Sequence, residues 1–282
     1  MESNMLVNTN WLSKNYNDNN LIILDASYYV DGGTIKAKKL YEANHIPNAI
    51  FFDIDKIADL ESNLPHTMPS KSFFSNKVGE LGISKDNNII IYDSANGVSA
   101  ASRAWWMFKA FGHNNVSILD GGIVKWKSEN LPVNDLPVIY RKKKYKSSQD
   151  ANKFIATKED ILNNIGNSKF KVLDARSPGR FYGKEVEPRP NLRSGHIPKS
   201  INVHYSELID KKIGIFKSET EIKNIFKEKN LNISDEIIAS CGSGVTACAL
   251  AFCLYLIGKN NTYIYDGSWV EWGSDEKLPI EK

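Results

Sequence analysis

The chain repeats itself once, with a period of about 150 residues. Four pairs of segments match in the same order in both halves: Leu24-Asp25-Ala26-Ser27 with Leu173-Asp174-Ala175-Arg176, His45-Ile46-Pro47 with His196-Ile197-Pro198, Leu81-Gly82-Ile83-Ser84 with Leu231-Asn232-Ile233-Ser234, and Asp120-Gly121-Gly122 with Asp266-Gly267-Ser268. Because this period is far longer than that of a solenoid repeat, the sequence predicts two copies of one domain.

Each copy alternates short apolar runs with longer helical stretches. The expected strands are 21–24, 89–92 and 116–119 in the first copy and 171–173, 236–239 and 262–265 in the second; helices are expected at 101–111 and 219–229. Such alternation predicts an α/β fold of tandem domains, each a mainly parallel sheet flanked by helices on both faces. We expect domains at 1–135 and 153–282, joined by a Lys-rich linker at 136–152.

Cys241 directly follows the short apolar run Ile237-Ile238-Ala239-Ser240, and an apolar helix is expected from Val245 to Ile257. Gly242 and Gly244 allow the intervening loop to curl, so that backbone N–H groups point inward at the helix N-terminus. These donors and the positive end of the helix dipole favour an anion there. The pattern therefore predicts a nucleophilic thiolate, and the alternative is a buried, inert cysteine beside a tight turn.

The residues that follow Cys241 argue against phosphatase chemistry. A phosphatase-type loop needs an arginine six residues after the cysteine, where this chain has Ala247. The first copy has no thiol in its corresponding loop. Aligning Gly97 on Gly244 puts Ser94 opposite Cys241, so we expect the first domain to be catalytically silent.

Composition excludes several classes of function. A net charge of +3 is too small to indicate nucleic-acid binding, and the basic run 141–144 is interpreted as a solvated linker. No run of 18 apolar residues exists, which excludes a membrane helix. Residues 1–4 do not resemble a leader, so a cytoplasmic location with reduced cysteines is expected.

The remaining cysteines and the histidines are assigned smaller roles. Cys248 and Cys253 fall inside the apolar helix as core residues, with a resolving-thiol role for Cys248 as the alternative. The cysteines and histidines lack zinc spacing, so no metal site is expected. His45 and His196 precede Ile-Pro in both copies, and we interpret them as structural.

These motifs together resemble the two-domain rhodanese-type sulfurtransferases. The loop Cys241-Gly242-Ser243-Gly244-Val245-Thr246 is similar to that of the 3-mercaptopyruvate branch, whereas the thiosulfate branch typically carries basic residues at 242 and 243. The resemblance covers nearly the whole chain and includes Phe51–Asp55, Gly179-Arg180-Phe181, Glu187-Pro188-Arg189 and Tyr265–Trp272.

The resemblance implies a particular site. Cys241 would carry the sulfur as a persulfide, with Gly242, Gly244, Val245 and Thr246 completing the loop that binds substrate. Arg180 and Arg189 match arginines that hold the carboxylate and carbonyl of a 2-oxo acid, a task suited to a planar guanidinium. From the residues alone, surface ion pairing of these arginines with Glu185 and Glu187 is the alternative.

The resemblance also implies a group that handles protons and a reaction. Ser243, His66 and Asp55 match a Ser–His–Asp assembly, with His66 and Asp55 coming from the first domain; by itself, His66 is interpreted as a loop histidine. Sulfur would pass from 3-mercaptopyruvate to a small thiol, cyanide or a dithiol protein such as thioredoxin, and pyruvate would leave. The resemblance implies no organic cofactor. Thiosulfate as the donor and a non-catalytic binding module are the alternatives.

Overall fold

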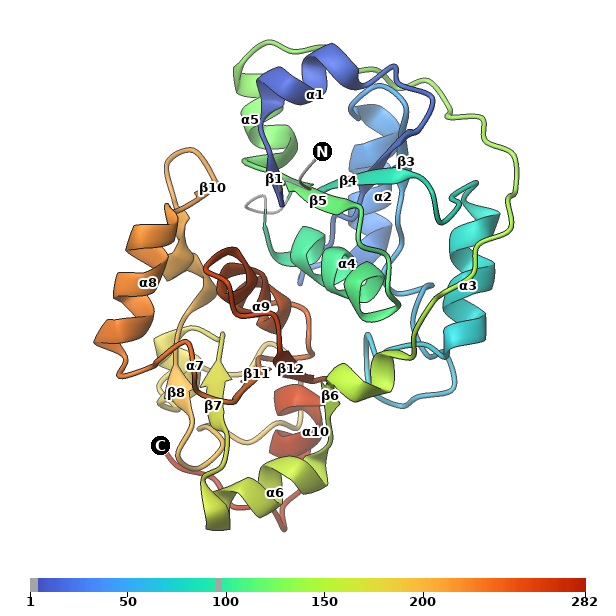
Figure 1. The fold of residues 1–282 in the computed structure, drawn as a ribbon. Helices are drawn as coiled ribbons and strands as arrows, with labels where there is room; N and C mark the ends of the chain where they lie inside the picture. Colours follow the sequence, from blue (N-terminus) through green and yellow to red (C-terminus); the bar gives the residue numbers. More distant parts are fainter. Residues whose placement is uncertain (1–4, 95–97) are drawn as a thin grey trace. The chain divides into compact units, whose positions relative to one another are not determined.

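The computed structural model describes residues 5–94 and 98–282 (Figure 1). Residues 1–4, on which the expected lack of a leader depends, and Gly97, used above to align the two loops, lie outside the described residues. The chain divides into two compact units: unit 1 comprises Met1–Leu60, Met68–Ala151 and Asp210–Phe216, and unit 2 comprises Glu61–Thr67, Asn152–Ile209 and Lys217–Lys282.

Unit 1 contains a parallel sheet with the strand order β1-β5-β4-β2-β3. Its elements are β1 Leu6–Val7, α1 Thr9–Asn15, β2 Leu21–Asp25, α2 Gly33–Ala43, β3 Ala49–Phe51, α3 Lys71–Glu80, β4 Asn88–Tyr92, α4 Ser99–Ala110, β5 Val116–Leu119 and α5 Gly122–Ser128.

Unit 2 contains a second parallel sheet with the order β6-β12-β11-β7-β8. Its elements are η1 Ala151–Phe154, β6 Ile155–Ala156, α6 Lys158–Asn167, β7 Lys171–Asp174, α7 Pro178–Phe181, β8 Ile201–Asn202, η2 Tyr205–Leu208, α8 Glu219–Glu228, β11 Ile237–Ser240, α9 Ala247–Leu256, β12 Thr262–Tyr265 and α10 Ser268–Ser274. The short strands β9 (Ile209–Asp210) and β10 (Ile215–Phe216) form a separate two-stranded sheet.

Helices flank both faces of each sheet, as the sequence predicts (Figure 1). On β4, Ile90 and Tyr92 pack in a core cluster with Leu12 of α1 and Trp126 of α5. Because side chains alternate along a strand, Ile91 points to the opposite face, where α4 packs against β4 and β5. Unit 2 repeats this arrangement, with α6 and α10 on one face and α9 against β11 and β12.

The sheet registers correct the alignment of the two loops. Asp25 pairs with Tyr92 in unit 1, and its counterpart Asp174 pairs with Ser240 in unit 2, so Asp93 rather than Ser94 corresponds to Cys241. The backbone agrees, because α5 and α10 donate equivalent N–H groups to the carbonyls of Asp93 and Cys241. The prediction for Ser94 is wrong by one residue, since strand pairing rather than loop similarity fixes the register.

The expected linker lies against unit 1 over part of its length. Lys143 N donates to the carbonyl of Gly79 at 2.9 Å, and Tyr145 is buried with its ring stacked on His113. A Cβ added to Gly79 would lie 2.5 Å from the Lys143 oxygen, so glycine permits this close approach.

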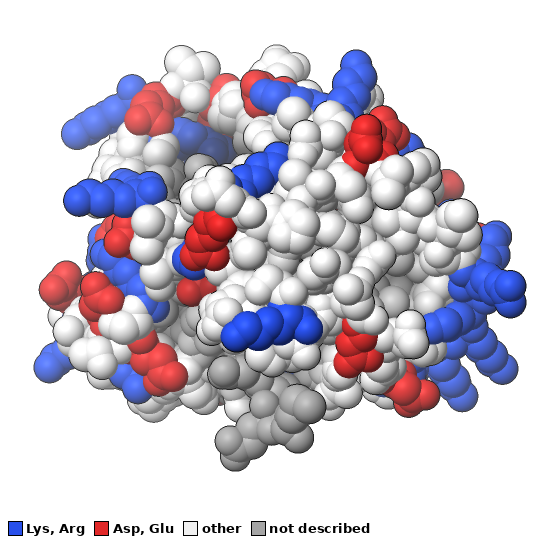
Figure 2. Space-filling model, turned by 90° about the horizontal axis from the view of Figure 1, so that it is seen from above, with Lys and Arg blue, Asp and Glu red and all other residues white. Residues whose placement is uncertain are grey.

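None of the helices in the described part of the chain combines the length and apolar character needed to cross a bilayer. Much of the face drawn in Figure 2 carries no charged side chain, and basic and acidic side chains are scattered mainly toward its edges.

Candidate active site

Cys241 lies at the carboxyl end of β11, where ligands of parallel sheets bind. Its residue is 2% exposed. The start of α10 holds the loop on one side: Trp269 N donates to the Cys241 carbonyl at 3.0 Å, and Val270 N donates to the Gly242 carbonyl at 2.9 Å. The cysteine therefore sits on backbone that two neighbouring elements fix.

The loop turns around the hydroxyl of Ser268. This oxygen accepts from Cys241 N at 3.2 Å and from Gly244 N at 3.1 Å, and it donates to the Tyr265 carbonyl at 2.7 Å. Gly244 has φ of +77°, a left-handed conformation that glycine adopts without steric cost. Two loop amides are thus committed to Ser268.

Helix α9 begins at Ala247, two residues after the expected start, and no side chain caps the backbone at Thr246. In its first turn, Cys248 N and Ala249 N already donate to the carbonyls of Val245 and Thr246, at 3.2 and 3.1 Å. The positive end of the helix dipole favours an anion in the loop. Cys248 and Cys253 are fully buried, and the Cys248 Sγ donates to the Gly244 carbonyl at 3.2 Å. Both lie in the core, as expected.

Two guanidinium groups converge on the cysteine loop. A Cβ added to Gly242 would lie 3.2 Å from Arg180 Nη2 and 3.8 Å from Arg189 Nη1. Arg189 Nη2 also donates to Ser243 Oγ at 3.4 Å. The predicted pair of arginines is therefore assembled beside Cys241, and the missing side chain at Gly242 leaves room for Arg180.

A buried carboxylate holds Arg180 in this place. Glu187, whose side chain is 2% exposed, accepts from Arg180 Nη2 at 2.5 Å and from Arg180 Nε at 3.1 Å. Its other oxygen accepts from Arg176 Nη1 at 2.8 Å. The ion pair between Arg180 and Glu187 exists, but it is not a pair of surface groups. It joins the Arg180 guanidinium, which lies beside the cysteine loop, to a carboxylate in the interior.

Arg176 anchors this network in the core. It bonds both oxygens of Asp174 and the carbonyl of Gly195, and its guanidinium carbon lies 4.1 Å from the ring centre of Trp269. Burial opposes the charge, but Asp174 and Glu187 outweigh it and raise the pKa of Arg176 above its usual value. The chain Asp174–Arg176–Glu187–Arg180 thus runs from β7 to the cysteine loop.

The three members of the expected Ser–His–Asp assembly have different surroundings. Ser243 is buried in the loop under Arg189. His66 is 6% exposed with φ of +62° and lies in the segment Glu61–Thr67, which belongs to unit 2. Asp55 belongs to unit 1, where it accepts from Thr34 Oγ1 at 2.9 Å.

Unit 1 carries a carboxylate where unit 2 carries the thiol. Oδ2 of Asp93 accepts from the N–H groups of Ala100 and Ala101, each at 2.9 Å, in the first turn of α4. A side-chain carboxyl oxygen of the protein therefore occupies this helix N-terminus. Between β2 and the end of α2, the segment 26–44 contains no arginine.

Sequence reasoning missed Arg176 and Ser268 as parts of the site, and it treated Glu187 only as a partner in surface pairing. Ser268 directly follows the Asp-Gly pair that occurs in both halves of the chain. This repeated motif could have indicated that the residue after it has a structural role. Arg176 differs from its counterpart Ser27 in an otherwise matched segment, which was a second signal. Among residues 5–94 and 98–282, no cluster of three or more His, Cys, Asp or Glu side chains could hold a metal ion.

Comparisons with known proteins agree with this geometry. A family model described as a rhodanese-like domain matches residues 8–129 and 157–275. The chain is 43% identical to 3-mercaptopyruvate sulfurtransferase of Mus musculus, over 89% of this chain and 84% of that protein. It is 40% identical to thiosulfate sulfurtransferase of Cricetulus griseus, over 95% of this chain and 91% of that protein.

A solved structure gives the same result. SseA of Escherichia coli, described with the 3-mercaptopyruvate sulfotransferases, superimposes with a TM-score of 0.83 at 32% identity, over 94% of this chain and 98% of that one. Two matched domains, parallel sheets in the same order and relatives at this identity leave one conclusion: the chain belongs to the rhodanese family, and it is a sulfurtransferase.

Proposed function

We propose that the chain transfers a sulfur atom from 3-mercaptopyruvate through a persulfide on Cys241 to a thiol, cyanide or dithiol-protein acceptor such as thioredoxin. The observation that carries this proposal is the convergence of Arg180 and Arg189 on an otherwise uncharged cysteine loop. Two guanidinium groups match the carboxylate and carbonyl oxygens of a 2-oxo acid, and charge-assisted bonds of this kind contribute about 1.5–3 kcal/mol each.

The reaction begins with attack of the Cys241 thiolate on the thiol sulfur of the donor. The new S–S bond forms as the C–S bond breaks, and the bonding electron pair leaves with the three-carbon fragment as the enolate of pyruvate. The thiol proton passes to this enolate, so the products are the persulfide anion and pyruvate. Arg180 and Arg189 stabilise the negative charge that develops on the enolate oxygen.

The loop then holds the persulfide. The positive end of the dipole of α9 favours the negative charge of the outer sulfur, and an acceptor thiolate or cyanide removes that sulfur. The proposal includes Ser243, His66 and Asp55 as the group that handles protons, and this part rests on the resemblance alone. A cytoplasmic location also stays a prediction, which cell fractionation would test.

Thiosulfate is the second candidate donor. A relative at 40% identity bears the name thiosulfate sulfurtransferase, and the same two guanidinium groups can face a dianion. Against it stands the pair Gly242 and Ser243, where basic residues would have added charge next to the cysteine.

Steady-state kinetics with both donors and one acceptor separate the candidates. We expect kcat/KM for 3-mercaptopyruvate to exceed that for thiosulfate, because thiosulfate has no carboxylate for the arginine pair. A higher kcat/KM for thiosulfate would overturn the proposed donor. If Cys241→Ser retained its activity with both donors, the proposed mechanism would be overturned.

A further inference from the structure

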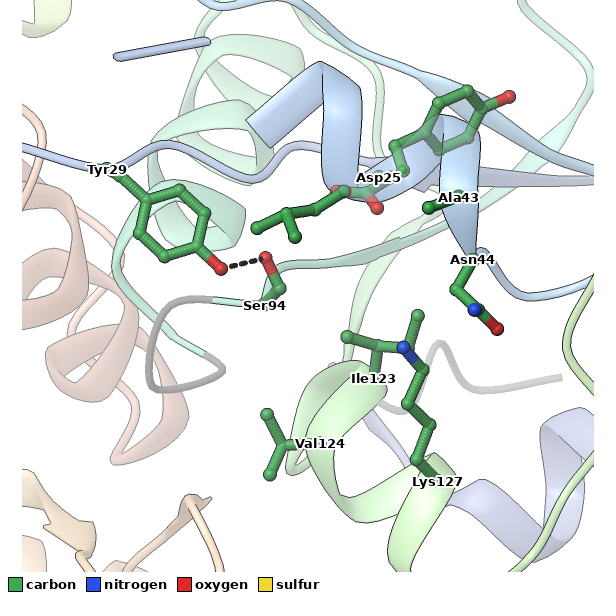
Figure 3. A pocket seen from close by; sticks show the side chains of 10 residues that line it. Asp25, Tyr29, Ala43, Asn44, Ser94, Ile123, Val124 and Lys127 are labelled. Atoms are coloured by element: carbon green, nitrogen blue, oxygen red, sulfur yellow. Dashed lines mark hydrogen bonds between the residues drawn. The ribbon is translucent and has the colours of Figure 1, made fainter. Parts of the chain in front are cut away.

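Unit 1 contains a pocket of about 280 Å³ lined largely by apolar side chains (Figure 3). Asp25, Tyr29, Ser94, Asn44 and Ile123 contribute to its wall, and the Tyr29 hydroxyl lies 2.8 Å from Ser94 Oγ. The volume suits a small organic molecule rather than a drug-sized one.

The repeat shows what occupies the corresponding place in unit 2. There, the guanidinium of Arg176 touches Asp174, the Gly195 carbonyl, Glu187 and the ring of Trp269. Asp174 corresponds to Asp25, Gly195 to Asn44 and Trp269 to Ile123. These three counterparts all line the pocket of unit 1.

The residue that would fill the pocket is absent from unit 1. Arg176 corresponds to Ser27, and both donate their backbone N–H to the preceding aspartate at 2.9 Å. The Ser27 hydroxyl bonds Asp25 as well, but it is far shorter than a guanidinium side chain. The pocket is therefore the space that an arginine occupies in the sister domain.

Among the described residues, Asp25 forms no salt bridge in this space, although a positive charge on nearby His45 would lower the pKa of its carboxyl and Lys127 lines the same pocket. Asp25 is 2% exposed, and its bonds go to Ser27 and to the Tyr92 hydroxyl. Burial raises its pKa to about 6, against the opposing effect of those hydrogen bonds. Tyr41 and His45 at the end of α2, Tyr92 on β4 and Lys127 on α5 are the other titratable groups nearby.

We propose that this pocket binds a small organic cation, a guanidinium or primary ammonium group carried on a short apolar body. The cation pairs with the buried Asp25 carboxylate and the carbonyl of Asn44, as Arg176 pairs with Asp174 and Gly195. The apolar body packs on Ile123, Val124 and Leu40. An anionic sulfur donor is excluded from the pocket by the same carboxylate, so this is no second donor site.

Methylguanidinium is the probe that tests this assignment, with the neutral, equally shaped methylurea as its control. Isothermal titration at pH 7.5 should give saturable binding of methylguanidinium with a Kd on the order of 1 mM and none of methylurea. Loss of the charged contact in Asp25→Asn should weaken binding about ten- to a hundredfold. Because binding needs the carboxylate, affinity should also fall as the pH drops below about 6.

Ser27→Arg is the matched variant, because it supplies the guanidinium from the chain itself. It should abolish binding of the probe and raise the unfolding temperature of unit 1. Equal binding of methylurea, unchanged binding in Asp25→Asn, binding retained in Ser27→Arg, or no saturable binding to the wild type would each overturn the proposal. Circular dichroism of each variant checks that it is folded.

Discussion

The two units share one sheet order but carry different side chains at the same helix N-terminus. In unit 1 a carboxyl oxygen of Asp93 accepts from the first turn of α4, so the protein itself supplies the acceptor. In unit 2 the equivalent position is Cys241, and the side chain of the N-cap residue Thr246 makes no capping hydrogen bond. The fold therefore provides an anion site twice, and only one copy offers it to a sulfur nucleophile.

The units also differ beneath the loop. Asp174 is neutralised by Arg176, whose second partner Glu187 positions Arg180 at the cysteine. Asp25 has a serine in place of that arginine, and no arginine lies between β2 and the end of α2. The exchange of arginine for serine, together with the absence of a counterpart of Arg180 in this segment, separates a charge network that reaches the substrate loop from a pocket with an unpaired carboxylate.

The largest expected effect comes from exchanging the nucleophile. Cys241→Ser should lower kcat/KM for sulfur transfer by about a thousandfold or more, because an unactivated hydroxyl cannot form the persulfide. Asp93→Ala, its counterpart in unit 1, should leave kcat/KM within about twofold. Steady-state assays of both variants measure this, and a comparable loss in Asp93→Ala would show that unit 1 takes part in the chemistry.

Replacing each of the two buried aspartates, Asp25 and Asp174, by asparagine should change the free energy of unfolding with opposite signs. The pKa of Asp25 is about 6 in the folded chain against 3.8 in the unfolded one, so the folded state binds the extra proton between these values. The free energy of unfolding of unit 1 therefore falls as the pH rises from about 4 to 6, by at most about 3 kcal/mol. At pH 7, Asp25→Asn removes this penalty and should stabilise unit 1.

Asp174→Asn should instead destabilise unit 2 by about 3 kcal/mol, because it leaves buried Arg176 with less counter-charge. Hydrogen exchange of the amides of β2 and β7, at pH 5 and 7, measures the stability of unit 1 and of unit 2 separately. Changes of the same sign in both variants would contradict the comparison.

The arginines should separate the two donors. Arg180→Ala and Arg189→Ala should each reduce kcat/KM for 3-mercaptopyruvate about ten- to a hundredfold, with a smaller loss for thiosulfate. Arg180→Lys keeps the charge but loses the forked contact to Glu187, so it should restore only part of the activity. Equal losses for both donors would mean that the guanidinium groups do not recognise the 2-oxo acid.

The smallest effect concerns the carboxylate that fills the helix terminus of unit 1. Asp93→Ala should lower the free energy of unfolding by about 1 kcal/mol, the usual contribution of such a cap. Asp93→Cys combined with Cys241→Ser should give no turnover of 3-mercaptopyruvate, because the segment 26–44 of unit 1 supplies no arginine. Turnover in that double variant would show that a cysteine at a helix terminus suffices without the arginine pair.

Much of this comparison could be predicted from local sequence. The three central strands of each sheet, the tandem architecture and the place of Cys241 followed from apolar runs and matched motifs, because these depend on neighbours along the chain. The two-residue and three-residue edge strands β1, β3, β6 and β8 were not predicted, since runs so short carry no pattern of their own. The correspondence of Asp93 with Cys241 did not, since the flanking glycine used for alignment lies in a loop whereas hydrogen bonding between strands sets the register.

The contacts of the site could not be predicted in the same way. Ser268 meets the cysteine loop from 27 residues away, and Glu187 joins two arginines whose approach only packing creates. Nothing in the spacing of Glu187 distinguishes a buried link from a surface pair. Likewise, the assignment of Glu61–Thr67 with His66 to unit 2 reflects tertiary contacts that no local pattern records.

Peptide mass mapping of the protein after exposure to 3-mercaptopyruvate, without an acceptor, tests the central claim most directly. The account predicts one added sulfur atom on the peptide that carries Cys241, which cyanide or a dithiol removes and which Cys241→Ser never acquires. Sulfur found instead on Cys248 or Cys253, or an added sulfur that persists in Cys241→Ser, would contradict it.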